Sequence, residues 1–92
     1  MSTPIGKVLK GIVDRYGLTK ALHKEKMPEY WAEVVGTRVA SISNVRSFEN
    51  GVLTVQISEP AWRTEITLRS QVIRQQLNTH IGEDVVEQII IR

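Results

Sequence analysis

The stretch from residue 50 to residue 77, NGVLTVQISEPAWRTEITLRSQVIRQQL, predicts a strand, a tight corner and a long helix in succession. In its first part the residues alternate between two sides, which is typical of a half-buried strand. Three apolar side chains on one of these sides are expected to face the core: Leu53, Val55 and Ile57. After them, Ser58 or Glu59 offers an oxygen that can cap a helix. Pro60 suits the first helical turn, where its missing N–H is not needed.

A hairpin is predicted around the start of this stretch. Residues 45–48 and 52–58 have strand character, and Asn50-Gly51 between them supplies the positive φ angles of a tight hairpin turn. The two strands are therefore expected to be antiparallel neighbours. Residues 85–91, VVEQIII, are rich in β-branched side chains and predict a last strand. Because a strand–helix–strand connection in one sheet favours a right-handed crossover, this strand should run parallel to a hairpin strand.

Two helices are predicted before the hairpin from the spacing of apolar residues. The first covers residues 3–16, and Gly17 ends it as a C-terminal cap. The second covers residues 18–26. It is expected to stop at Met27-Pro28, because the residue before a proline disfavours helical geometry.

A further helix is predicted on each side of the hairpin. The one before it begins at Pro28 and runs to about residue 42, with Gly36 as a kink or as a point where another backbone packs closely. The long helix after the hairpin ends near Gly82, and Leu68 and Val72 are expected to widen its apolar face. The centre of that face is formed by Trp62, Ile66, Ile73 and Leu77.

These elements add up to an α+β fold of order α-α-(α)-β-β-α-β, with a three-stranded mixed sheet and helices packed on one face. The 92 residues are expected to form a single domain, 1–92. With 41% hydrophobic and 24% charged residues, the composition is that of an ordinary globular chain. The longest apolar run, residues 89–91, is far too short to span a bilayer, and no secretion signal is recognised, so a cytoplasmic protein is expected. The absence of cysteine excludes a disulfide framework and a thiolate metal site.

The positive charge is concentrated near the N-terminus. Residues 1–26 hold six bases and two acids, 6 − 2 = +4, whereas the remaining residues hold six bases and eight acids, 6 − 8 = −2. Such a segment can attract phosphate, although a solvated lysine face explains it equally well. The candidate nucleic-acid-binding residues chosen on this ground are Lys7, Lys10, Lys20, Lys24, Lys26 and Arg38.

No catalytic, cofactor-binding or metal-binding constellation is recognised in the sequence. His23 and His80 are isolated, and surface positions are expected for both. No phosphate-binding glycine loop occurs, so an ATP-dependent role would need the ATPase of a partner. Trp31 and Trp62 both fall on the apolar faces of predicted helices, which favours core packing over base stacking.

Several motifs together resemble the DciA family, whose members are bacterial proteins that assist loading of the replicative DNA helicase. The matching runs are YWAEVVG from residue 30, RVA from residue 38, NGVLTV from residue 50, SEPAW from residue 58 and the segment from residue 68 to IRQQLN at residues 73–78. The resemblance extends from about residue 5 to residue 92. The residues that match the family pattern are interpreted as fold-making: Trp31, Gly36, Asn50, Gly51, Pro60 and Trp62.

The resemblance implies a KH-like domain that contacts the replicative helicase and binds single-stranded or forked DNA, without hydrolysing a nucleotide itself. KH domains grip four nucleotides through a G-x-x-G loop. The chain contains no G-x-x-G, so the fold is expected without that binding mode. Neither a membrane nor a small-molecule substrate is expected as a partner. The alternative is a general single-stranded DNA or RNA binding module that has no helicase partner.

Overall fold

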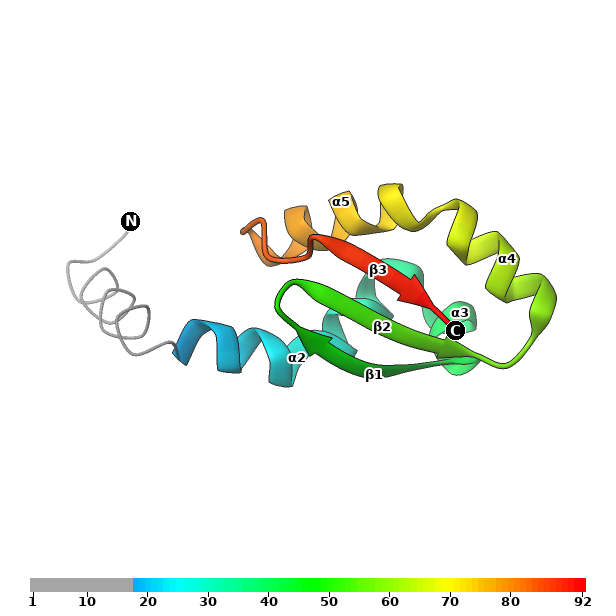
Figure 1. Cartoon of the computed structure of the whole chain (residues 1–92), viewed down its shortest axis with the longest axis horizontal. Coiled ribbons are helices and arrows are strands. Elements are labelled where there is room, and N and C mark those ends of the chain that lie inside the picture. The colour runs from blue at the N-terminus through cyan, green and yellow to red at the C-terminus, as the bar shows by residue number, and fades with distance from the viewer. Residues whose placement is uncertain (1–17) are drawn as a thin grey trace.

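The sheet is organised around β2 (Val52–Ile57), which is the middle strand in the order β1-β2-β3 (Figure 1). The computed structural model describes residues 18–92, so the helix predicted over residues 3–16 lies outside the described part of the chain. β1 (Ser43–Glu49) pairs with β2 in antiparallel fashion, and β3 (Gln88–Ile91) pairs with β2 in parallel. Both pairings confirm the predictions made from the hairpin pattern and from the crossover rule.

The turn between β1 and β2 is held by residues with positive φ angles, 51° at Asn50 and 80° at Gly51. The carbonyl oxygen of Gly51 accepts hydrogen bonds from the N–H groups of Glu87 at 2.8 Å and of Gln88 at 3.2 Å. A Cβ atom on Gly51 would lie 2.9 Å from Cγ of Glu87. The tip of the hairpin therefore needs a glycine for its backbone conformation, and a Cβ atom there would also displace the Glu87 side chain.

The first described helix, α2 (Leu18–Val35), continues through Pro28. The predicted break at Met27-Pro28 is therefore wrong. Met27 is 0% exposed and Trp31 is 2% exposed, one helical turn apart on the side that meets the core. Burial of such side chains stabilises a fold by about 1.5–3 kcal/mol each. This gain outweighs the roughly 3 kcal/mol that a proline inside a helix costs.

Gly36 separates α2 from the short helix α3 (Thr37–Ser41). Its φ of 88° lies in the left-handed region, which favours glycine. A Cβ atom at this position would meet nothing within 4 Å. The glycine therefore serves the change of direction between the two helices and not a close approach of another backbone.

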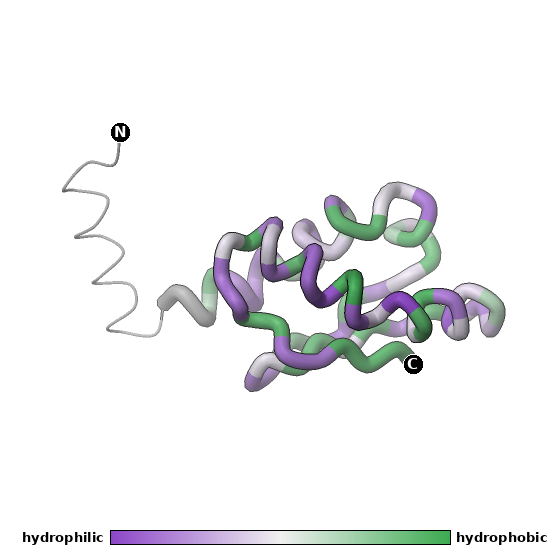
Figure 2. The backbone as a smooth tube through the Cα atoms, turned by 90° about the horizontal axis from the view of Figure 1, so that it is seen from above, coloured by the Kyte–Doolittle hydropathy of each residue, from purple (hydrophilic) through white to green (hydrophobic). Residues whose placement is uncertain are grey.

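The helical segment after the hairpin is divided into α4 (Pro60–Leu68) and α5 (Ser70–Ile81), which meet at Arg69. The prediction of one long helix with Leu68 and Val72 on its apolar face is therefore wrong, since these side chains are 79% and 57% exposed. α4 packs against β2 and β3, whereas α5 packs against α2 and β3. The bend at Arg69 lets α4 and α5 pack against these different elements. Figure 2 shows hydrophobic and hydrophilic residues interspersed along the helices.

The two ends of this helical segment differ in how they are capped. Glu59 is the N-cap of α4, but its side chain makes no capping hydrogen bond. Instead, Nε of Arg63 donates to the carbonyl oxygen of Ile57 at 3.0 Å and so fastens the corner after β2. Gly82 ends α5 with a φ of 89°, as the predicted loop glycine should.

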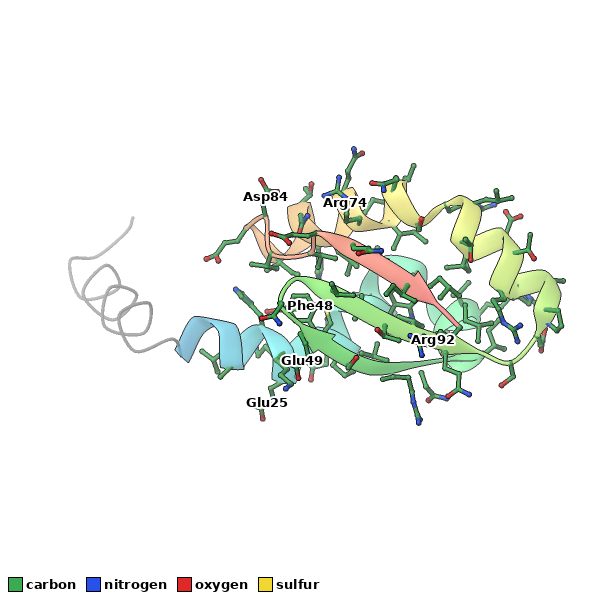
Figure 3. The ribbon with its side chains drawn as sticks, viewed as in Figure 1. Glu25, Phe48, Glu49, Arg74, Asp84 and Arg92 are labelled. Carbon is green, nitrogen blue, oxygen red and sulfur yellow. The ribbon has the colours of Figure 1, made fainter. Side chains whose placement is uncertain are left out.

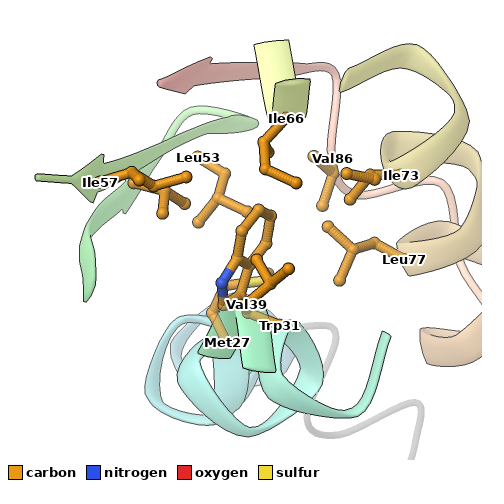
Figure 4. Close-up of a cluster of buried hydrophobic side chains, with 10 residues drawn as sticks. Met27, Trp31, Val39, Leu53, Ile57, Ile66, Ile73, Leu77 and Val86 are labelled. Atoms are coloured by element: carbon orange, nitrogen blue, oxygen red, sulfur yellow. The ribbon is translucent and has the colours of Figure 1, made fainter. Parts of the chain in front are cut away.

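The core lies between the sheet and the helices (Figure 4). Leu53, Val55 and Ile57 are fully buried, which confirms the side of β2 predicted to face inward. Their partners from the helices and from the loop before β3 are Met27, Trp31, Val39, Ile66, Ile73, Leu77 and Val86. The result is an α+β fold with helices against a three-stranded mixed sheet, as predicted, and it fits a KH-like domain.

Asn78 is the buried polar residue that positions the loop leading into β3. It is 6% exposed. Its Nδ2 donates to the carbonyl oxygen of Val86 at 2.9 Å, and its Oδ1 accepts from the N–H groups of Val85 at 3.1 Å and of Val86 at 2.8 Å. Every polar atom of the amide group is thereby satisfied, so the side chain replaces backbone pairing where the chain leaves α5.

Candidate nucleic-acid interface

Only some of the predicted basic residues near the N-terminus lie in the described part of the chain. Lys7 and Lys10 lie outside the described residues, and Lys20 contributes its backbone to α2. Nζ of Lys24 forms an exposed ion pair with Oε1 of Glu49 at the end of β1. Lys26 lies on the exposed side of α2. The charge of Lys24 is thus already opposed by a carboxylate at the hairpin.

Arg38 is not brought together with these lysines. It lies on α3, and eleven helical residues, about 16 Å of helix axis, separate Lys24 from the end of α2 at Val35. Its guanidinium carbon lies 5.7 Å from the centroid of the Trp62 ring. This cation–π contact joins α3 to α4 and occupies the face of the half-buried indole. The residues chosen from charge alone therefore do not form one cluster in the described structure.

Trp31 and Trp62 have different environments. Nε1 of Trp31 donates to Oγ of Ser43 at 2.9 Å, and that hydroxyl donates to the carbonyl oxygen of Val39 at 2.7 Å. The indole N–H is therefore satisfied inside the core, which leaves Trp31 no surface for stacking on a base. Trp62 is partly buried and packs against the edge of the core.

The two histidines are not isolated in the structure, because each meets a glutamate from another part of the chain. Nε2 of His23 lies 3.4 Å from Oε2 of Glu83, and Nε2 of His80 contacts Oε2 of Glu33. The Tyr30 ring lies near both imidazoles, with centroid distances of 6.3 Å to His23 and 5.9 Å to His80. These contacts join α2 to α5 and to the loop that follows it. They form no metal site, since within residues 18–92 no group of three or more potential ligands comes together.

A hollow of about 480 Å³ lies between α2, the hairpin tip and the loop before β3. Figure 3 shows three of its lining residues, Phe48, Glu49 and Asp84, at the same end of the sheet. Glu87 lines it as well, together with the cation Lys24. The carboxylates in this hollow make it unfavourable for a phosphate group.

A second hollow, of about 400 Å³, lies on the sheet and has the opposite charge. It is lined by Arg46, Ser47, Thr54, Gln56 and Arg92 and contains no carboxylate side chain. Figure 3 shows Arg92 at the other end of the sheet from Glu49 and Asp84. Two arginines and no acidic side chain line this hollow, so it is basic.

Neither Arg46 nor Arg92 is among the residues predicted from the sequence. Arg46 occupies a β-bulge, because Val45 pairs with Val55 and Ser47 with Thr54, so that Arg46 has no partner of its own in the ladder. A bulge changes the side on which the following residues lie and cannot be located from alternation alone. The one signal in the sequence was the polar side of β2, which places Thr54 and Gln56 away from the core.

No helix within residues 18–92 is both long enough and apolar enough to cross a membrane.

The model of one protein family, described as "Dna[CI] antecedent, DciA", matches residues 4–91. The chain belongs to the DciA family. Similar proteins include UPF0232 proteins of Mycobacterium ulcerans (23% identical), Mycobacterium tuberculosis H37Rv (24%) and Mycobacterium leprae strain TN (25%), each over 88 residues. Each alignment covers 96% of this chain and 47% of the relative. This DciA-family chain therefore spans about half the length of the curated relatives it matches.

Proposed function

We propose that the protein is a non-enzymatic accessory factor of bacterial DNA replication, which recruits or helps to load the replicative DNA helicase and binds single-stranded or forked DNA. The observation that carries this proposal is the match of the DciA family model over residues 4–91. The protein would act in the cytoplasm, where it would need no cofactor because the helicase supplies the nucleotide hydrolysis.

Size-exclusion chromatography with light scattering tests the helicase contact. The protein is mixed with the replicative helicase of its own organism at about 0.15 M salt, where exposed charges further apart than about 8 Å are largely screened. A complex of defined stoichiometry that persists through the column is expected. The matched control is the helicase mixed with the same protein after the protein has been denatured. Clean separation over a series of salt and nucleotide conditions would refute the helicase role.

A second candidate function is supported by the basic hollow on the sheet. Arg46 and Arg92 provide phosphate-binding groups that require no helicase, which is what a general single-stranded DNA or RNA binding module would possess. The two functions differ in a simple way. The general binder retains nucleic acid in a filter or anisotropy assay but forms no complex with the helicase on the column.

A further inference from the structure

The face of the sheet that turns away from the core carries no helix in the described structure. Figure 1 shows α2 and α3 behind the strands, with the other face of the sheet turned toward the viewer. Alternation along β2 places Thr54 and Gln56 on this open face, because Leu53, Val55 and Ile57 are buried on the opposite one. The side chains on the open face are therefore accessible to a partner.

Two arginines frame this face from the two outer strands. Arg46 lies at the bulge in β1. Arg92 directly follows β3, and its backbone N–H donates to Val55 at 2.9 Å while its carbonyl oxygen accepts from Ile57 at 2.8 Å. This pairing aligns Arg92 with Gln56. The side chains of Arg92 and Gln56 therefore line the same hollow, and Arg46 lines it from β1. Neither arginine forms an ion pair with another of the residues 18–92.

We propose that the open face of the sheet is a binding site for the sugar-phosphate backbone of single-stranded DNA, with Arg46 and Arg92 as its phosphate ligands. The choice of DNA rests on the proposed function. Planar guanidinium groups bind phosphate oxygens through two parallel hydrogen bonds. Hydroxyl and amide groups also donate to phosphate, and Ser47, Thr54 and Gln56 supply them between the two arginines.

The composition of this face favours the backbone over the bases. Sequence-tolerant binding through bases needs aromatic platforms. Phe48, the one aromatic residue in the three strands, pairs with Leu53 and packs against the core. Among residues 18–92, the strands therefore offer no such platform on the open face, so the contacts to DNA should be independent of base identity.

The same composition favours a polyanion over an acidic protein. Protein interfaces are centred on buried aromatic or other large anchors in pockets. The hollow is lined only by arginine, serine, threonine and glutamine side chains. A partner that presents repeated negative charges and needs no apolar anchor matches this hollow.

The charge distribution also predicts the path that the bound DNA takes across the sheet. Two strand spacings, about 10 Å, separate the backbones of β1 and β3, so the arginines can reach one phosphate or two neighbouring phosphates. The hairpin end of the sheet carries Glu49 and Glu87, which repel phosphate. The DNA backbone should therefore cross the strands near Gln56 and not run along them toward the hairpin.

Fluorescence anisotropy with labelled oligothymidylate tests the proposal on the full chain. Arg46→Gln/Arg92→Gln is compared with Arg69→Gln/Arg74→Gln, which removes the same charge from the junction of α4 and α5 and from α5, and which serves as the matched control. Loss of Arg46 and Arg92 should lower the affinity by about tenfold for each arginine, the loss typical of one charge-assisted contact. The slope of log K against log salt should fall in magnitude by about 1.4, since each phosphate contact contributes about 0.7 for single strands. An abasic oligonucleotide of the same length should bind as tightly as oligothymidylate.

A third variant, Lys20→Glu/Lys24→Glu/Lys26→Glu, examines the patch predicted from the sequence. If this variant loses DNA and the Arg46/Arg92 variant does not, the site lies on the helices and the sheet proposal is wrong. Equal losses in the Arg46/Arg92 variant and its charge-matched control would show general electrostatics only and would also overturn it.

Two further outcomes separate the sheet proposal from the proposed function. If the Arg46/Arg92 variant retains DNA but no longer forms the helicase complex on the column, the open face is a protein contact. If the wild-type protein forms the helicase complex but binds no single-stranded DNA, the recruiting role stands and the DNA site does not exist.

Discussion

Replacement of Asn78 with alanine gives a direct measure of how the loop before β3 is held. Three hydrogen bonds to Val85 and Val86 are lost in the buried setting described above, at about 1 kcal/mol each. Alanine is the better helix former by about 0.5 kcal/mol, which offsets part of the loss. The free energy of unfolding should therefore fall by about 2.5 kcal/mol.

The assay is urea unfolding followed by tryptophan fluorescence, since Trp31 is buried in the core and becomes exposed on unfolding. With an m-value of about 1.5 kcal/mol/M, the loss corresponds to a midpoint lowered by about 1.7 M. Gln75→Ala is the control, because Gln75 is an exposed amide on the same helix. If both variants unfold at the same urea concentration with unchanged m-values, the three hydrogen bonds do not stabilise this loop and the reasoning is refuted.

Three other substitutions can be tested by urea unfolding. Gly51→Ala should lower the free energy of unfolding by more than Gly82→Ala. Alanine at either position is strained by about 1–2 kcal/mol in the left-handed conformation, but only at position 51 would its Cβ also clash with the Glu87 side chain. Equal losses would count against the clash. Trp31→Phe removes the donor to Ser43 and should cost about 1 kcal/mol or more. Because it also removes the fluorescent reporter, its urea unfolding is followed by far-UV circular dichroism, and an unchanged midpoint would contradict the role of that hydrogen bond. Leu68→Ser should change stability by less than about 0.5 kcal/mol because the side chain is 79% exposed, and a larger loss would place Leu68 in a contact.

The sheet could be predicted because its signals are local. Asn50-Gly51 defines the turn by its own backbone preference, and the alternation around Leu53 and Val55 reports which side of β2 is buried. The parallel direction of β3 followed from chain connectivity. These parts of the fold depend on neighbouring residues and on a general rule of handedness. They can therefore be predicted from a single sequence.

The two errors in the helices arise from packing that a sequence does not display. The preference of Pro28 for a helix start is overcome by Met27 and Trp31, whose burial depends on a sheet that is distant in the chain. No proline or glycine near Arg69 marks the bend in the sequence. The bend results from the different packing partners of α4 and α5, so apolar spacing alone placed Leu68 on the wrong side.

The candidate site was the least predictable part of the molecule. Charge counting selected residues close together in sequence, yet Lys24 is paired with Glu49 and Arg38 lies over Trp62. Arg46 and Arg92 are 46 positions apart in the sequence, 92 − 46 = 46, and meet only through the register of the sheet. That register depends on the bulge, and no local pattern reveals where the bulge is.

The bulge at Arg46 also affects how the protein behaves at high concentration. β1 is an edge strand, and an edge with a regular row of N–H and C=O groups is a template on which strands of other molecules can add. The extra residue interrupts that row in the middle of β1 and places a charged side chain beside it. The irregularity that puts Arg46 next to the open face therefore also protects the sheet from growing into an aggregate.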